Sequence, residues 1–357
     1  MIQTLCDRAP LVAGDSVCLT GGGGYLGRHV AAALVSRGFH VVATLRDLDK
    51  AGDLRRDLEQ HMDHTDLPID FVQADLSGDR GWGLAISACK AVVHTASPFP
   101  DRTPKDPRNL IRLAVEGTER VLRAAHAHAV NRIVLTSSIV AVTNKPLGEG
   151  RNAYDERDWS DPDDRRTDGY TMSKLVAEER AWQLAESLGL DLTVLNPGLI
   201  FGPPIGDSGA TSVGIVKRFL RGRDPALPDA AFPSVDVRDV AAAHAEALLR
   251  PASIGQRFLL TEATLSMADI AGIIGKLYPS RAIRTGIATH DMVRMAAKFD
   301  PTLEIVLPHL GEAPLASNES ARNTLGSHFQ SARAAIANTA QYLMKKELAE
   351  AERAAFA

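Results

Sequence analysis

The stretch that decides the fold is Thr20-Gly21-Gly22-Gly23-Gly24-Tyr25-Leu26-Gly27. It follows residues 17–19, an apolar run that predicts a strand, and it leads into residues 26–37, whose pattern predicts a helix. Glycines here let the backbone approach a pyrophosphate because no Cβ intervenes, and the helix N-terminus offers free N–H groups. The spacing of Gly21, Gly24 and Gly27 therefore predicts a dinucleotide site, with a flexible glycine turn as the alternative. A P-loop is a still less favoured interpretation, since Arg28 follows Gly27 and no Gly-Lys-Ser/Thr is present.

Composition narrows the class of protein. The 357 residues suffice for two domains, or for one domain with an extra lobe. A net charge of −4 favours neither nucleic acid nor an anionic membrane as a partner. Three widely spaced cysteines indicate a reducing compartment rather than a disulfide framework. Because residues 1–14 lack the apolar region of a signal peptide and no apolar run has membrane length, we expect a soluble, cytoplasmic protein.

The first half of the chain alternates strand-like and helix-like segments. Strands are predicted to end at Leu19, Leu45, Ala74, His94, Thr136 and Asn196, and helices to span about 26–37, 50–60, 81–87, 107–128 and 170–188. Repeated units of this kind predict an α/β fold with a Rossmann-type, doubly wound parallel sheet.

The pattern changes after residue 198. Residues 202–206, Gly-Pro-Pro-Ile-Gly, are rich in turn formers, and a proline-rich segment runs through Pro233. We expect helices at about 211–221 and 240–249, a strand at 257–260 and a closing helix from about 331. Residues 14–198, with about 234–261, are assigned to the dinucleotide-binding domain. Residues 199–233 and 262–357 are assigned to a smaller, mostly helical substrate lobe.

The end of the second strand indicates which dinucleotide is bound. Arg46 follows that strand directly and Lys50 comes four residues later. Two cations suit the 2′-phosphate of NADP, whereas a carboxylate would suit the ribose of NAD. Asp47 leaves NAD as the less favoured alternative, because a shift of one residue would place its carboxylate at the site. Asp75, after the third strand, has two readings: an acceptor for the adenine amino group, or a helix N-cap.

A second signal is Tyr170-Thr-Met-Ser-Lys174. On a helix Tyr170 and Lys174 share a face, and Asp168 can cap the helix start. A tyrosine hydroxyl has a pKa of about 10, and a neighbouring ammonium would lower that pKa toward neutrality. The predicted fifth strand ends in Thr-Ser137-Ser138, at the sheet edge where ligands bind in such folds. We expect one serine to bond within the turn and the other to face the substrate.

With these motifs the chain resembles an extended short-chain dehydrogenase/reductase, within the dihydroflavonol reductase, cinnamoyl-CoA reductase and bacterial aldehyde/ketone reductase group. The resemblance spans about residues 15–260 in family order, and it implies a serine–tyrosine–lysine triad. By motif position the triad is Ser138, Tyr170 and Lys174. The cofactor contacts implied by the motifs are Gly21, Gly24, Tyr25, Leu26, Gly27, Arg46, Lys50, Asp75, Leu76, Thr95, Ala96, Ser97, Tyr170, Lys174, Pro197 and Gly198.

The resemblance implies NADPH-dependent reduction of an aldehyde or ketone to an alcohol, with the reverse oxidation possible. Alternatives are an NAD-dependent nucleotide-sugar epimerase or dehydratase and a non-catalytic NADP-binding regulator. Ala114 argues against the epimerase, because many epimerases carry asparagine there. The Asn-Trp-Tyr-Cys-Tyr signature of the plant cinnamoyl-CoA enzymes is missing around Tyr170, which makes the plant substrates doubtful.

Other partners and sites follow from single residues. Phe201 and Ile205 suggest a hydrophobic or aromatic small-molecule substrate, and the resemblance implies a monomer or homodimer. No metal site is expected, since His61-Met-Asp-His-Thr-Asp66 has the character of a solvated loop. His94 is expected to serve packing or hydrogen bonding. Residues 155–158 and 161–166 are expected to form exposed loop, with Trp159 either lining the substrate entrance or stapling the surface.

Overall fold

The computed structural model describes residues 11–98 and 106–355. A seven-stranded parallel sheet, with strand order β3-β2-β1-β4-β5-β6-β9, forms its centre. The strands are β1 Ser16–Thr20, β2 His40–Leu45, β3 Ile69–Gln73, β4 Ala91–His94, β5 Arg132–Thr136, β6 Asp191–Pro197 and β9 Arg257–Leu260. This order reverses between β1 and β4, so the expected doubly wound, Rossmann-type sheet is confirmed.

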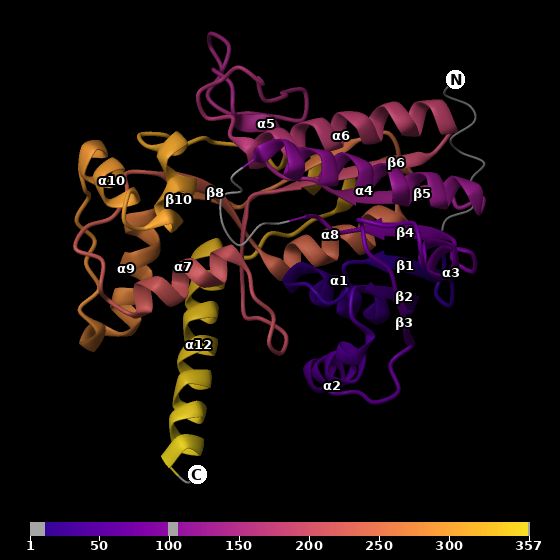
Figure 1. Cartoon of the computed structure of the whole chain (residues 1–357), viewed down its shortest axis with the longest axis horizontal. Coiled ribbons are helices and arrows are strands. Elements are labelled where there is room, and N and C mark those ends of the chain that lie inside the picture. The colour runs from indigo at the N-terminus through magenta and orange to yellow at the C-terminus, as the bar shows by residue number, and fades with distance from the viewer. Residues whose placement is uncertain (1–10, 99–105, 356–357) are drawn as a thin grey trace.

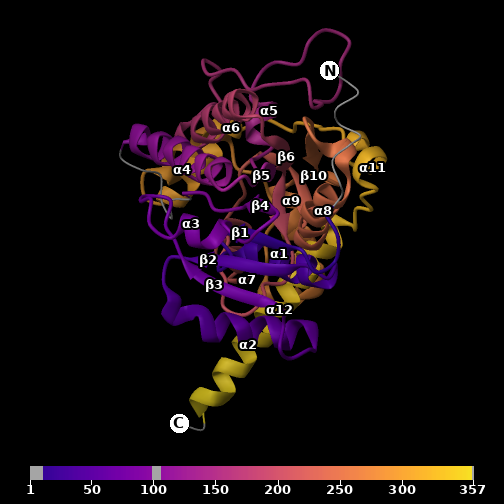
Figure 2. The same ribbon diagram turned by 90° about the vertical axis from the view of Figure 1, so that its right-hand side faces the viewer.

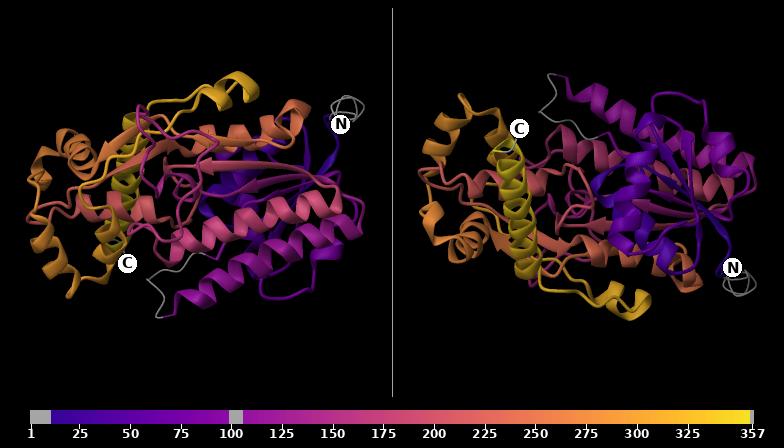
Figure 3. Two further views of the ribbon diagram at one scale, coloured as in Figure 1. Left: turned by 90° about the horizontal axis from the view of Figure 1, so that it is seen from above. Right: turned by 90° about the horizontal axis from the view of Figure 1, so that it is seen from below.

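Helices cover both faces of the sheet, which explains why its strands are almost wholly apolar (Figures 1 and 3). One face packs on α1 Tyr25–Ser36, α2 Ala51–Met62 and α8 Val237–Leu249. The other packs on α3 Trp82–Ile86, α4 Pro107–Ala127 and α6 Gly169–Leu188. Helices α4 and α6 lie side by side, so α6 is held along its length. The short elements are η1 Leu48–Lys50, α5 Val140–Thr143, η2 Pro251–Ser253 and α11 Glu319–Leu325.

A smaller lobe lies beside the carboxyl edge of the sheet and has its own apolar core. Its three-stranded sheet has the order β10-β8-β7. Its elements are β7 Leu199–Phe201, α7 Thr211–Leu220, β8 Ala231–Asp236, β10 Ala263–Ser266, α9 Met267–Leu277, η3 Pro279–Arg281, α10 His290–Ala297, η4 Pro301–His309 and α12 Ala332–Ala355. The C-terminal end of α12 projects away from the body of the molecule (Figures 1 and 2).

The lobe's small sheet was not expected from the sequence. Pro233 lies within β8, and a proline in an interior strand removes a ladder hydrogen bond. The register explains why it is tolerated, because β7 begins opposite Ser234 and Pro233 therefore pairs only with β10, through Thr264. β8 spans the boundary predicted between residues 233 and 234, and the division into two domains remains a prediction.

Two further expectations concern the state of the cysteines and the presence of a membrane-spanning segment. Cys18 and Cys89 are buried free thiols, while Cys6 and the start of the chain lie outside the described residues. None of the helices in the described ranges is both long and apolar enough to cross a bilayer.

Candidate active site

The glycine loop between β1 and α1 is closed so tightly that side chains cannot enter it. Gly21 has a φ of +71°, a conformation that favours glycine. A Cβ on Gly27 would lie 2.1 Å from the carbonyl oxygen of Gly21, and one on Gly21 would lie 2.9 Å from the Cα of Ala96. Helix α1 begins at Tyr25 with no side-chain cap on Gly24. The loop and the first N–H groups of α1 therefore fit a pyrophosphate.

The side chains that follow the loop tie it to residues 202–206. The hydroxyl of Tyr25 donates to the carbonyl oxygen of Gly202 (2.9 Å). Arg28 donates to the carbonyl oxygens of Gly23 (3.1 Å) and Ile205 (3.1 Å) and pairs with Asp57 (2.6 Å). The side chain of Tyr25 thus serves the fold, and a contact of Tyr25 with the cofactor remains a prediction.

Two cationic side chains, those of Arg46 and Lys50, follow the end of β2. That strand ends at Leu45, so Arg46 is the first residue beyond it. Arg46 and Lys50 are exposed, and neither side chain pairs with a residue in the described part of the chain. Asp47 is occupied instead, because its carboxylate accepts from the N–H of Asp49 and caps η1. The arrangement favours a phosphate beside Arg46 over a ribose hydroxyl on Asp47.

Asp75 does not act as a helix cap, so that reading is wrong. Helix α3 begins seven residues later, with Gly81 as its N-cap. The Asp75 carboxylate instead accepts from the N–H (2.7 Å) and hydroxyl (2.6 Å) of Ser77, and these bonds lower its pKa. Leu76 packs closely on α4, since a Cβ on Gly117 would lie 3.0 Å from its Cβ. Contacts of Asp75 and Leu76 with the cofactor remain predictions.

The end of β4 is bonded to the end of β1. The hydroxyl of Thr95 donates to the carbonyl oxygen of Thr20 (2.6 Å), and the N–H of Ala96 donates to the Thr20 hydroxyl (3.1 Å). That hydroxyl also bonds Nδ1 of His94 (2.7 Å). Burial lowers the pKa of His94 to about 3, so the ring is neutral. The expected hydrogen-bonding role of His94 is confirmed.

Ser138, Tyr170 and Lys174 meet at the carboxyl edge of the sheet. Asp168 caps α6 by accepting from the N–H of Thr171 (2.8 Å), which places Tyr170 in the first turn of the helix. The hydroxyl of Tyr170 is hydrogen-bonded to Ser138. The Nζ of Lys174 lies 5.9 Å from the centre of the Tyr170 ring and has no hydrogen bond or ion pair with any residue in the described ranges. An uncommitted ammonium is thus present beside the tyrosine.

The expectation that Lys174 brings the pKa of Tyr170 toward neutrality is wrong. Desolvation raises the pKa of Tyr170 to about 12, against a lowering by the bond from Ser138. Lys174 lies over the ring rather than beside the hydroxyl. Its own pKa is lowered by burial to about 8, while the charge of Glu178 raises it. Tyr170 therefore stays protonated at neutral pH, which is the form that donates a proton.

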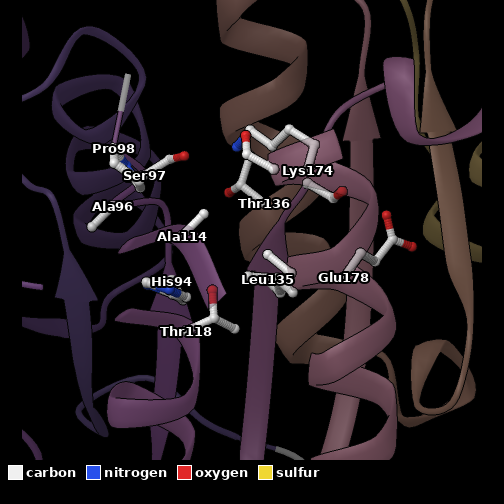
Figure 4. A pocket seen from close by; sticks show the side chains of 13 residues that line it. His94, Ala96, Ser97, Pro98, Ala114, Thr118, Leu135, Thr136, Lys174 and Glu178 are labelled. Carbon is white, nitrogen blue, oxygen red and sulfur yellow. The ribbon is translucent and has the colours of Figure 1, made fainter. Parts of the chain in front are cut away.

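Ser137 and Ser138 do not have the separate turn and substrate roles that we expected. The hydroxyl of Ser138 accepts from the N–H of Val140 (3.4 Å) and also bonds Tyr170, so one serine serves both the turn and the site. The hydroxyl of Ser137 is buried and has no hydrogen-bond partner in the described structure. Ser137 lines a small pocket. Lys174 and Thr136 lie on one wall of this pocket, and Ala114, His94 and Thr118 lie on the opposite wall (Figure 4).

Behind these residues lies a buried hydrogen-bond network that sequence reasoning missed. Asn196 links the carbonyl oxygen of Ser138 to the carboxylate of Glu178, and Glu178 pairs with Arg257. Glu178 lies four residues after Lys174, and Asn196 directly precedes the expected cofactor contacts Pro197 and Gly198. Nothing in their spacing, however, indicated that they contact each other.

The charge-rich segment before α6 is partly buried, contrary to expectation. Asp158 and Arg166 are buried because each is paired: Asp158 with Arg151 (2.5 Å) and Arg166 with Asp164 (2.7 Å). Trp159 covers the Arg257 guanidinium at 3.7 Å. The staple reading of Trp159 is therefore the one that the contacts support.

The histidine-rich stretch at residues 61–66 makes no metal centre. His61 packs edge-on against His29, with ring centres 5.8 Å apart. Within the described ranges no three histidine, cysteine or acidic side chains converge on a common point.

Comparison with known proteins agrees with this geometry. The model of the NAD dependent epimerase/dehydratase family matches residues 17–260. Cinnamoyl-CoA reductase 1 of Arabidopsis thaliana is 36% identical over 276 residues, which cover 76% of this chain and 78% of the relative. The NADPH-dependent methylglyoxal reductase Gre2 of Saccharomyces cerevisiae is 26% identical over 351 residues, covering 93% and 99%.

Solved structures lead to the same group. The crystal structure of yeast methylglyoxal/isovaleraldehyde reductase Gre2 complexed with NADPH matches with a TM-score of 0.74 at 26% identity, covering 93% of this chain and 99% of the other. Vestitone reductase from alfalfa shares the fold, with a TM-score of 0.71 at 24% identity and the same coverage. The reductase group indicated by the sequence motifs is confirmed.

Proposed function

The chain belongs to the NAD dependent epimerase/dehydratase family, and we propose that it uses NADPH to reduce an aldehyde or ketone to an alcohol. It is an NAD(P)-dependent oxidoreductase of the reductase group to which its relatives belong. One observation carries the proposal: the Tyr170 hydroxyl is bonded to Ser138, one helical turn from the uncommitted ammonium of Lys174. This pair of hydroxyls is arranged to hold and protonate a carbonyl oxygen.

NADPH fits the residues that would hold it. The loop from Gly21 to Gly27 forms a cradle that a Cβ would fill, and it opens at the N-terminus of α1. Arg46 and Lys50, at the end of β2, make no hydrogen bond or ion pair through their side chains within the described ranges and would hold the 2′-phosphate. Pro197 ends β6, and Gly198 accommodates β8 so closely that a Cβ would lie 2.3 Å from the carbonyl oxygen of Pro233. These residues would line the nicotinamide end.

The side chains divide the chemistry of reduction among them. When bound, NADPH supplies the hydride. Ser138 donates a hydrogen bond to the carbonyl oxygen and stabilises the negative charge that develops there. Tyr170 donates its proton to that oxygen, for which its raised pKa keeps it in the acid form. Lys174, whose ammonium makes no hydrogen bond or ion pair with a residue in the described ranges, would hold the ribose beside the nicotinamide.

The proposed substrate is a small hydrophobic or aromatic carbonyl compound. The expectation that Phe201 and Ile205 face the substrate is wrong, because both side chains are buried in apolar cores. Support comes instead from the half-buried Leu199 and Ile200 of β7, where the lobe meets the sheet edge. The names of the relatives agree with carbonyl chemistry, since they denote methylglyoxal and cinnamoyl-CoA reductases.

The test is a panel of aliphatic and aromatic aldehydes and ketones, with NADPH consumption followed by its absorbance. We expect stoichiometric oxidation of NADPH and formation of the alcohol with at least one aldehyde. Turnover of a nucleotide sugar without net consumption of NADPH would instead indicate an epimerase.

Arg46 provides a separate prediction about the cofactor. Arg46→Ala should weaken NADPH binding about 10- to 100-fold, the value of a hydrogen bond to a charged group, and leave NADH binding nearly unchanged. Fluorescence titration with both cofactors measures this, with Arg123→Ala on the exposed face of α4 as the matched control. Equal losses for NADPH and NADH would show that Arg46 does not contact the 2′-phosphate.

A further inference from the structure

The backbone of Ser138 is held by the buried side-chain amide of Asn196. Asn196, the second-last residue of β6, is fully buried, and its Nδ2 donates to the carbonyl oxygen of Ser138 (3.1 Å). The same Nδ2 donates to Oε2 of Glu178 (2.7 Å). The backbone of the residue that bonds Tyr170 is thereby tied to the helix that carries Tyr170 and Lys174.

Glu178 is itself held so that it cannot turn away. Its Oε1 accepts from Nε of Arg257 (2.6 Å), and Glu178 is only 1% exposed. Arg257 is in turn fixed by the carbonyl oxygens of Glu156 (3.1 Å) and Asp158 (2.8 Å) and by the ring of Trp159. Both carboxylate oxygens of Glu178 accept hydrogen bonds, one from Asn196, which holds Ser138, and one from Arg257 of β9.

Glu178 also lies one turn of α6 beyond Lys174. Its charge raises the pKa of Lys174, in opposition to the burial that lowers it. The other titratable groups near the ammonium are Tyr170 on α6 and His94 on β4, and His94 is neutral because burial lowers its pKa to about 3. The side chains that face the same pocket from α4, from the end of β5 and from the residue after β5 carry no charge: Ala114, Thr118, Thr136 and Ser137.

We propose that Glu178 is a positioning residue for both halves of the catalytic site. Through Asn196 it fixes Ser138 against Tyr170, and through its charge it keeps Lys174 protonated. The inference rests on the proposed function for the role of Ser138, while the effect on Lys174 is measurable by cofactor binding alone.

Glu178→Gln tests the charge. The NADPH affinity of the wild type should fall as pH rises through about 8, where Lys174 loses its proton. In the variant this fall should move to lower pH by about one unit or more, because an opposite charge near the ammonium is gone. Glu179→Gln, at the exposed neighbour that has no ion pair with a described residue, is the matched control and should follow the wild type.

Asn196→Leu tests the link to Ser138 with a side chain of similar shape, and it leaves the Glu178–Arg257 pair intact. We expect kcat to fall about tenfold, the value of one net hydrogen bond that positions Ser138, with NADPH affinity and its pH dependence unchanged. Because the loss acts through the Ser138 hydroxyl, it should disappear when Ser138→Ala is already present.

The outcomes separate this inference from the proposed function. A pH dependence of NADPH binding that is unmoved by Glu178→Gln, or an Asn196→Leu loss equally large with Ser138→Ala present, would overturn it. If circular dichroism shows that Glu178→Gln does not fold, the inference is tested by comparing Asn196→Leu with and without Ser138→Ala. If no carbonyl is reduced by the wild type but the NADPH titration still shifts in Glu178→Gln, the proposed function fails and the coupling to Lys174 stands.

Discussion

Tyr170→Phe is expected to lower kcat about 10²- to 10⁴-fold, the usual contribution of a general acid. The variant removes only the hydroxyl that is bonded to Ser138, so the ring and its packing beside Lys174 remain. NADPH affinity should change little. The measurement is single-turnover reduction of the best aldehyde from the panel at saturating NADPH.

The control is Tyr278→Phe in the substrate lobe, whose hydroxyl has no hydrogen bond within the described chain. It should retain wild-type turnover. Retention of turnover in Tyr170→Phe would show that another group delivers the proton.

Gly27→Ala should abolish NADPH binding at concentrations that saturate the wild type. The added Cβ would meet the Gly21 carbonyl oxygen at 2.1 Å, so the loop must open and lose the backbone geometry that faces the pyrophosphate. Isothermal titration with NADPH measures the loss.

Gly52→Ala on α2 is the matched control, because its Cβ would meet no atom within 4 Å. That variant should bind NADPH normally and gain about 0.5–1 kcal/mol of stability from the higher helix propensity of alanine. Unchanged NADPH binding by Gly27→Ala would mean that the cofactor does not sit in this loop.

The strands of the large sheet could be predicted because helices cover both faces. Apolar runs such as Val17-Cys-Leu19 and Leu192-Thr-Val-Leu195 have no solvent side, and the structure places them in β1 and β6. The small sheet escaped prediction for the opposite reason. β7 has three residues and β8 contains Pro233, so neither has a periodicity long enough to distinguish it from loop.

Within the site, the predictable part was local. The spacing of Tyr170 and Lys174 on one helix, and the place of Ser138 after a strand, followed from the chain order. The pKa of Tyr170 did not, since it depends on burial and on a lysine that lies over the ring. The contacts among Glu178, Asn196 and Arg257 join three separate elements, and only tertiary packing brings them together.

Transfer of deuterium from NADPH labelled at nicotinamide C4 tests the central claim most directly. With a reactive aldehyde and each C4 stereoisomer in turn, mass spectrometry of the product follows the label. The account predicts an alcohol that carries one deuterium on the former carbonyl carbon with one isomer, and one NADP⁺ formed per alcohol. An unlabelled product with both isomers, or product formed while NADPH stays constant, would contradict it.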